Sequence, residues 1–439
     1  MDGFAFLMLP VAFLLIFLGI QVAFAMMITA VIFGMITFGD RVVFQFIEKI
    51  DDLSTNFVFA AIPLFVFMGA MLEKSGIADR LFEAIHIWTR RLPGGLALAT
   101  VLMCVIFAAS SGVIGATESI VGLLTIPVML RYGYSRGLIS GTICAGGSLG
   151  TIIPPSVVVI VMGPLANLSV GDLMYGMLLP GLLLGALYCV YILVICIVDP
   201  TAGPRLPPEP GEPSFARKLW ITTSNLLPPV FMIFAVLGSI LLGWASPTEA
   251  AAIGALASVL LTIGYRRFAW SGLWEALLRT LRVTAMIMAV LLAGTLFTGV
   301  FIGAGGLQMA NQLITDLALS RWMLLAVMLL IVFLSGFFLD WISVVLIFVP
   351  IFIPLVSAAG FDPVWFCILF LIIIQTSYLT PPMAPAIFYL RAVAPPQITI
   401  SDMYRGVVPF IGLQLVALVV TIVWPELVTW LPSVMLRPH

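Results

Sequence analysis

A single acidic side chain lies inside a long apolar stretch in the second half of the chain. Between Arg321 and Asp362 the only ionisable residue is Asp340, in the string LSGFFLDWIS. A carboxylate together with hydroxyl and carbonyl oxygens suits a hard cation such as Na⁺, and Ser335 and Ser343 are close enough in sequence to contribute. The pattern therefore predicts a Na⁺ site. A carboxylate that only caps the N-terminal end of a helix would fit the same pattern.

The first half holds an acidic residue among small ones. Residues 109–119 read ASSGVIGATES, where small and hydroxyl side chains replace the Leu and Val of a lipid-facing segment. Small residues also let membrane helices pack closely, so packing alone is one explanation of this string. Glu118 adds a carboxylate, whose burial in a membrane costs on the order of a few kcal/mol and indicates a cation, proton or basic partner nearby. If the segment turns early, Glu118 lies in water instead.

Two apolar segments are broken by proline pairs. The first reads GGSLGTIIPPS over residues 146–156, and the second reads QTSYLTPPMAP over residues 375–385. Proline removes a backbone donor and disturbs the carbonyl one turn earlier, which exposes oxygens that can coordinate a cation. A simple helix kink is the alternative, but matched pairs beside Gly, Ser, Thr and Gln favour a binding site.

The composition places these residues in a membrane. The chain has 439 residues, of which 62% are hydrophobic and only 9% charged, too few to cover a water-soluble globule of this size. At least ten apolar segments of spanning length fit along it, since one span needs about 20 residues. Five cysteines without CxxC spacing and two histidines argue against disulfides and against a His-built metal site. With a net charge of −1 and no basic run, the sequence also gives no sign of a nucleic-acid partner.

The elements that position the motifs occur twice. The Pro-rich, charged stretch 199–218 predicts a cytoplasmic linker between two similar halves. We expect an all-α polytopic membrane protein with two inverted-topology repeats, 1–198 and 219–439, each containing a re-entrant hairpin and a broken helix. The expected ranges are 40–56 and 266–282 for amphipathic arm helices at the membrane surface, about 96–130 and 322–357 for the hairpins, and about 137–163 and 364–390 for the broken helices.

Charge placement predicts the orientation. Most Lys and Arg residues fall on the same side as the linker, and cytoplasmic loops collect such residues. The loop after the first hairpin, RYGYSR, is basic, whereas its counterpart SAAGFDP contains no base. The halves are therefore expected to be oppositely oriented, with the first hairpin entering from the cytoplasm, the second from the periplasm, and both termini outside.

At these motifs the sequence resembles the large membrane subunit of tripartite ATP-independent periplasmic (TRAP) transporters, the DctM-like family. The resemblance runs nearly end to end and includes GIQVAFAM, RLPGGLALATVLMCVIFAASSGVIGATES, WASPTEAAAIGALAS, GFFLD and LTPPMAPAIFYLRAVAPP. It implies a Na⁺-driven elevator mechanism, in which a transport domain containing both hairpins moves against a scaffold containing the arm helices. It implies no enzymatic activity.

Residue by residue, the resemblance implies Na⁺ ligands at Ser110, Ser111, Gly112, Thr117, Thr151, Pro154, Ser335, Gly336, Asp340 and Thr380. It implies a substrate site between the hairpin tips, near Glu118, Ser148, Gln375 and Thr376. Small or apolar residues are common in the family at the position of Glu118, which leaves a proton contribution open.

The resemblance also implies the setting of the protein. The expected location is the bacterial inner membrane, and the expected partners are a small four-helix membrane subunit (DctQ-like) and a periplasmic substrate-binding protein. Na⁺ is the implied coupling ion. The last motif is similar to the branch associated with 2-oxo acids, lactate, mannitol or chloroaromatic compounds, so a small organic acid, 2-oxo or lactate-like, is the expected solute.

Three other functions fit parts of the pattern. A stand-alone Na⁺/dicarboxylate elevator symporter would share the architecture but work without a binding protein. An intramembrane aspartyl protease could use Asp340, but it would need a second carboxylate at a matched site, and its usual Gly-Asp motif is missing. A passive channel fits less well, because paired re-entrant hairpins with hydroxyl-rich tips suit occlusion.

Overall fold

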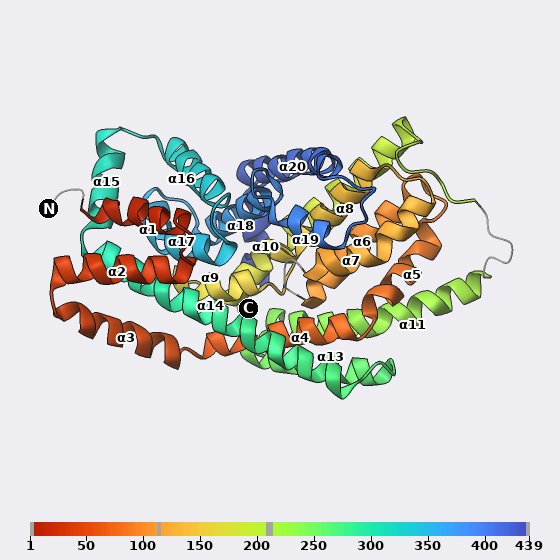
Figure 1. Cartoon of the computed structure of the whole chain (residues 1–439), viewed down its shortest axis with the longest axis horizontal. Coiled ribbons are helices and arrows are strands. Elements are labelled where there is room, and N and C mark those ends of the chain that lie inside the picture. Colours follow the sequence, from red (N-terminus) through yellow and green to blue (C-terminus); the bar gives the residue numbers. More distant parts are fainter. Residues whose placement is uncertain (1–3, 112–115, 208–213, 436–439) are drawn as a thin grey trace.

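The computed structural model describes residues 4–111, 116–207 and 214–435, and within these ranges the chain forms helices and no strand. Seven of the described helices are long and apolar enough to cross a membrane, and several shorter apolar helices accompany them. The all-α, multi-span class predicted from composition is therefore confirmed. Figure 1 shows an elongated arrangement, in which the helix pairs α6/α7 and α16/α17 lie on opposite sides of a central helix, α18.

The helices of the first half follow the expected order. Their bounds are α1 Met8–Phe17, α2 Val22–Phe38, α3 Arg41–Thr55, α4 Ala61–Lys74, α5 Ile77–Thr89, α6 Gly95–Ser111, α7 Ala116–Arg131, α8 Arg136–Ser148, α9 Val157–Ala166 and α10 Val170–Val198. The hairpin range thus holds α6 and α7, and the broken-helix range holds α8 and α9.

The second half repeats this order after the linker. Its helices are α11 Phe215–Ile233, α12 Ser239–Leu241, α13 Pro247–Gly264, α14 Trp270–Gly303, α15 Gly306–Asp316, α16 Arg321–Ser335, α17 Trp341–Ala358, α18 Pro363–Leu379, α19 Pro385–Val393, α20 Ile400–Val423 and α21 Glu426–Met435. A π-helical turn, Phe234–Gly238, joins α11 to α12. Here α16 and α17 occupy the hairpin range, and α18 and α19 occupy the broken-helix range.

The two arm ranges differ in the structure. In the first half Asn56 has an extended backbone and its side chain accepts a hydrogen bond from the Val58 N–H at 3.1 Å, which separates α3 from the next span. In the second half the range 266–282 does not end before a span, because α14 begins at Trp270 and continues unbroken to Gly303. No Gly, Pro or Asn interrupts residues 279–290, so nothing there disfavours the helix.

Local sequence signals set the other helix ends. Ser246 and Glu249 form a reciprocal capping box at the start of α13, and Thr399 and Asp402 form another at the start of α20. Gly19, at φ +91°, provides the left-handed backbone that turns α1 into α2. These short caps and turns hold consecutive helices side by side.

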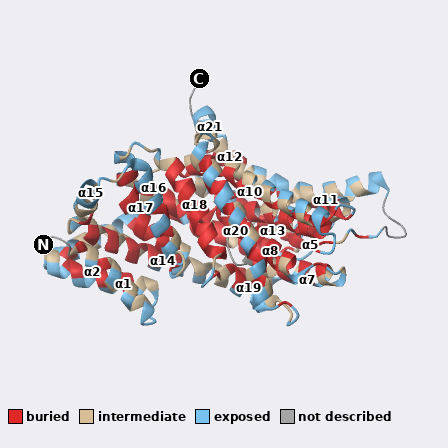
Figure 2. Cartoon of the chain, turned by 90° about the horizontal axis from the view of Figure 1, so that it is seen from above, coloured by how far each residue is buried: buried red, intermediate tan, exposed pale blue. Residues whose placement is uncertain are grey.

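The first segments of both broken helices lie in the core. Every residue from Trp365 to Leu379 in α18 is buried, and so is every residue from Leu138 to Ser148 in α8. Figure 2 shows this buried interior running through the middle of the molecule. Around it, α14 packs against α2, α4 and α17, and α4 packs against α13. The motifs are therefore held by buried helices between the two hairpins.

Candidate functional site

Both helix breaks contain a cis Pro–Pro bond. After α8 ends at Ser148, a 3₁₀ turn (Leu149–Thr151) leads to a cis Pro154–Pro155 bond, and α9 begins at Val157. After α18 ends at Leu379, Thr380 leads to a cis Pro381–Pro382 bond, and α19 begins at Pro385. At each break, carbonyls at the end of the buried helix accept hydrogen bonds from nearby side chains or from the first N–H after the helix, in place of the N–H groups of a continuing helix.

The first break is tied to the second broken helix. The Gln375 amide Nε2 in α18 donates to Ser148 Oγ in α8 at 3.0 Å, and both side chains are fully buried. Ser148 Oγ donates to the Ala145 carbonyl at 2.8 Å, and Thr151 Oγ1 donates to the Ser148 carbonyl at 2.8 Å. Two residues that the sequence assigns to the substrate site, 227 positions apart, therefore form one hydrogen-bonded pair.

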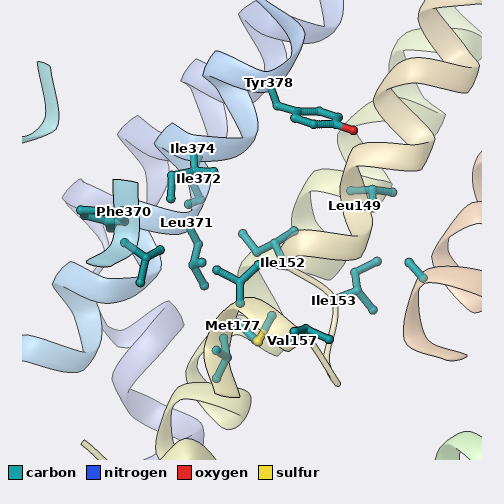
Figure 3. Close-up of a cluster of buried hydrophobic side chains, with 14 of the residues drawn as sticks. Leu149, Ile152, Ile153, Val157, Met177, Phe370, Leu371, Ile372, Ile374 and Tyr378 are labelled. Carbon is teal, nitrogen blue, oxygen red and sulfur yellow. The ribbon is translucent and has the colours of Figure 1, made fainter. Parts of the chain in front are cut away.

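Apolar side chains surround this pair. Figure 3 shows Ile152 at the first break lying toward Leu371 and Ile374 of α18, while Leu149 and Ile153 lie on the side of the break away from α18. All five are buried. The aromatic ring of Tyr378 extends from α18 toward the helix that carries Leu149 (Figure 3). Polar contacts in such surroundings are shielded from water, which strengthens them.

In the first half, α6 and α7 form hairpin 1, and its second helix, α7, packs against α8 just before the first break. Thr117 and Glu118 lie in the first turn of α7, and both are fully buried. The Glu118 carboxyl lies directly over Gly147, because a Cβ placed on Gly147 would come within 2.5 Å of the Glu118 Cδ. Glu118 is therefore inside the protein, and the alternative that an early turn leaves it in water is wrong.

The remaining predicted residues of hairpin 1 are described only in part. Ser110 and Ser111 end α6, with their side chains outside the description, and Gly112 lies outside the described residues.

At the tip of hairpin 2, the pair α16 and α17, Asp340 directly precedes α17. Its Oδ2 accepts the Ile342 N–H at 3.1 Å, and its Oδ1 accepts a short hydrogen bond from the Ser343 hydroxyl. Asp340 is thus a helix N-cap, as one of the two sequence interpretations holds. Each carboxylate oxygen has a second lone pair, so the cap leaves acceptor capacity for a cation.

The tip packs closely against the second broken helix. Ser335 is buried at the end of α16, and Gly336 approaches Ser377 of α18 so closely that a Cβ would overlap the Ser377 hydroxyl. One turn on, Thr380 Oγ1 donates to the Thr376 carbonyl at 2.7 Å. Gly336 therefore contacts the end of α18 at Ser377, beside the hydrogen-bonded Thr376 and Thr380.

A cavity opens beside this contact. It has a volume of about 770 Å³ and lies between the start of α2, the middle of α14, the hairpin 2 tip and the α18–α19 break. Gly336 and Asp340 line it, together with Ser377 and Tyr378. This volume falls in the range typical of small-molecule sites, about 300–1,000 Å³. The cavity therefore connects the predicted cation ligands of hairpin 2 to a space that could hold a solute.

Comparison with known proteins identifies the family. A family model described as "Tripartite ATP-independent periplasmic transporter, DctM component" matches residues 9–427. The chain belongs to the DctM family. The C4-dicarboxylate TRAP transporter large permease protein DctM of Pseudomonas aeruginosa is 31% identical over 390 residues, covering 88% of this chain and 87% of that protein. The sialic acid TRAP transporter large permease protein SiaM of Vibrio cholerae is 28% identical over 424 residues, covering 96% and 97%.

Solved structures support the fold. The YdaH transporter of Alcanivorax borkumensis superposes with a TM-score of 0.66 at 14% identity, covering 88% of this chain and 89% of that one. MtrF of Neisseria gonorrhoeae superposes with a TM-score of 0.57, also at 14% identity, covering 85% and 82%. At this identity the likeness concerns the fold alone. The DctM permease is a multi-pass inner-membrane protein of secondary organic-acid transport and not an enzyme, which removes the protease interpretation.

The permease brings together some predicted site residues but not all. Ser148 is hydrogen-bonded to Gln375, and Gly336 packs against Ser377, which lies between the predicted residues Thr376 and Thr380 in the sequence. None of the four predicted substrate residues lines the large cavity. Their role as substrate ligands stays a prediction, and so does the Na⁺ site.

Several residues of the permease site carried little sequence signal. Ser377 sits between two predicted residues and packs on Gly336. Gln414 Nε2 in α20 donates to the Tyr188 hydroxyl of α10 at 2.9 Å, with both side chains fully buried. Gln414 could have been noticed in the sequence, because it is an amide within an apolar span. No local pattern distinguishes Ser377 from a serine that only allows close helix packing.

Proposed function

We propose that this permease couples inward Na⁺ movement to the uptake of a small organic acid, 2-oxo or lactate-like, across the inner membrane. In this proposal a small four-helix membrane subunit completes the membrane part, and a periplasmic protein captures the acid and delivers it. The tripartite description of the family and the relatives named as organic-acid permeases support it.

The observation that carries the proposal is the setting of Asp340. The carboxylate is the only charged group among the described residues that line the 770 Å³ cavity, and Ser343 and Ile342 hold it in place through hydrogen bonds. A fixed carboxylate close to the carbonyls at a helix end offers the oxygen ligands that Na⁺ prefers. An organic acid would bind near Asp340 only when Na⁺ balances the negative charge of the Asp340 carboxylate. Na⁺ binding and substrate binding would therefore be linked.

The proposed roles of the remaining residues follow from their positions. Thr380 and the carbonyls at the end of α18 would complete the Na⁺ site of hairpin 2, together with Ser335 and Gly336. Thr151 and the carbonyls before Pro154 would contribute to a second site facing α7, with Thr117 and hairpin 1. We propose that the two hairpins and broken helices move as one body against α2, α4, α13 and α14, which is the elevator form of alternating access.

The first test is transport by the reconstituted system. Uptake of radiolabelled 2-oxo acids into proteoliposomes holding the permease and its small subunit is measured with and without an inward Na⁺ gradient and the binding protein. We expect uptake only when both are present. Uptake with Na⁺ but without the binding protein would indicate a free-standing symporter. Uptake that does not depend on Na⁺ would contradict the proposed role of Asp340 in Na⁺ binding.

The second test separates cation binding from helix capping. Asp362 caps α18 as Asp340 caps α17, since its Oδ1 accepts the Trp365 N–H at 2.8 Å. Asparagine caps about as well as aspartate, so Asp340→Asn and Asp362→Asn should be equally stable. Only Asp340→Asn should abolish Na⁺-dependent uptake, because only this change removes a charge from the cavity. Equal Na⁺-dependent uptake by the two variants would show that Asp340 serves only as a helix N-cap and does not bind Na⁺.

A further inference from the structure

Aromatic side chains form part of the wall of the large cavity. Six of its lining side chains are aromatic, and they come from both sides of the space: Phe24, Phe337, Phe338, Trp341, Tyr378 and Tyr389. Phe24 belongs to α2, while the others belong to the hairpin 2 tip and the α18–α19 region. Aromatic faces bury a large apolar area at little cost in side-chain freedom, so they suit a ligand with an apolar body.

The charge of the same wall restricts the ligand further. Among the described residues that line the cavity there is no Lys, Arg or His, and Asp340 supplies a negative charge. Sites that recognise carboxylates through side chains use arginine or lysine. Here an organic acid would find its positive charge only in a cation held by Asp340.

A single cation held by Asp340 balances only the Asp340 charge, so a bound monocarboxylate leaves one negative charge in the cavity and a dicarboxylate leaves two. A second carboxylate on the ligand would sit in the aromatic part of the cavity without a partner, and an unpaired charge in such surroundings is strongly disfavoured. The aromatic part would instead gain from each methylene or ring carbon removed from water.

We propose that this cavity binds a monocarboxylate with an apolar, branched or aromatic body and discriminates against C4-dicarboxylates. The inference rests on the proposed function, because it takes the cavity as the place where the organic acid is bound. It adds that the permease itself selects the substrate class and does not leave selection to the binding protein alone.

Direct binding to the permease tests this without the selectivity of the binding protein. The full chain, reconstituted with its small subunit in nanodiscs containing Na⁺, is titrated with pyruvate, phenylpyruvate, 4-methyl-2-oxopentanoate and succinate by calorimetry. We expect the two larger monocarboxylates to bind at least about tenfold more tightly than succinate. Affinity should also rise by about fourfold for each buried methylene relative to pyruvate.

Two variants change the wall in opposite ways. Phe24 is 57% exposed, so Phe24→Ala should leave the fold intact while lowering phenylpyruvate affinity by about five- to tenfold more than pyruvate affinity. Gln21→Arg, also on the wall, adds the missing positive charge and should improve succinate binding by about tenfold. The matched controls, Phe231→Ala on α11 and Gln312→Arg on α15, lie outside the wall and should change neither affinity.

The outcomes separate the inference from the function. If organic acids bind but succinate binds as tightly as phenylpyruvate, and Phe24→Ala and Gln21→Arg match their controls, the substrate class is wrong while organic-acid transport stands. If no acid binds, and the complete system takes up no acid in the presence of the Na⁺ gradient and the binding protein, the proposed function fails and the inference fails with it. Preference for the larger monocarboxylates, lost in Phe24→Ala, would support both.

Discussion

The contact between Gly336 and Ser377 makes a sharp test of how hairpin 2 sits on the broken helix. A Cβ added to Gly336 would overlap the Ser377 hydroxyl and lie 2.8 Å from the Ser377 Cβ, closer than real Cβ contacts. Ser377 has little freedom to move away, because it is 2% exposed and its hydroxyl donates to the Ile374 carbonyl at 2.8 Å. Gly336→Ala must therefore push the hairpin tip away from α18.

The expected cost is that of overpacking a rigid core, about 1–3 kcal/mol of unfolding free energy. Gly412 provides the control, since it lies within α20 and a Cβ there would have no neighbour within 4 Å. Gly412→Ala should therefore be neutral or stabilising by about 0.5–1 kcal/mol, because alanine favours the helix. Of the two Gly-to-Ala changes, only Gly336→Ala is predicted to lower the free energy of unfolding.

The assay is unfolding of the purified permease in one detergent, followed by intrinsic fluorescence for each variant. Ser377→Gly completes a double-mutant cycle, since it removes the side chain that the new methyl group meets. In the Gly336→Ala background it should recover stability, with a coupling of at least about 0.5 kcal/mol. Equal stability of Gly336→Ala and Gly412→Ala, or an additive cycle, would show that the tip does not rest on Ser377.

Three further changes probe other contacts by the same unfolding measurement. Gly141→Ala should destabilise the permease more than Gly336→Ala, because its Cβ would collide with the Gly406 backbone carbonyl, which no side-chain rotation can clear. A Gly141→Ala variant at least as stable as Gly336→Ala would contradict the close approach of α8 and α20. Asn56→Ala should cost about 0.5–2 kcal/mol by removing the cap that separates α3 from α4, and no loss would mean that the cap is dispensable. The side chains of the Lys74–Glu275 ion pair are 42% and 61% exposed. A double-mutant cycle should therefore give a coupling energy of about 0.2–1 kcal/mol that falls at high salt. A larger coupling energy that does not depend on salt would contradict the surface position of the pair.

Local features of the sequence were sufficient for the architecture. The apolar composition requires membrane helices, and the proline pairs break α8–α9 and α18–α19 where they occur, since proline cannot continue the hydrogen bonding of a helix. The isolated Asp340 was equally visible, because one charge in an apolar run needs no knowledge of distant residues. Its two interpretations remained open, and the structure shows the cap while leaving the cation site as a proposal.

Contacts between distant residues could not be predicted in this way. The pairing of Ser148 with Gln375 depends on how two separate broken helices pack, and no pattern near either residue specifies its partner. The same holds for Ser377 beneath Gly336, and for Phe24, which reaches the cavity wall only because α2 lies against the second half. The continuity of α14 was also missed, since a surface arm and a span look alike when no residue between them breaks the helix.

The sequence by itself thus determined the family, the membrane class and the places where helices break, because these depend on composition and on residues adjacent in the chain. Only the tertiary structure decided that Glu118 is buried against Gly147 and that an aromatic cavity lies beside Asp340. The physical reason is that burial and cavity shape result from packing many side chains from both halves at once. The same local strings in a different packing would have produced a different site.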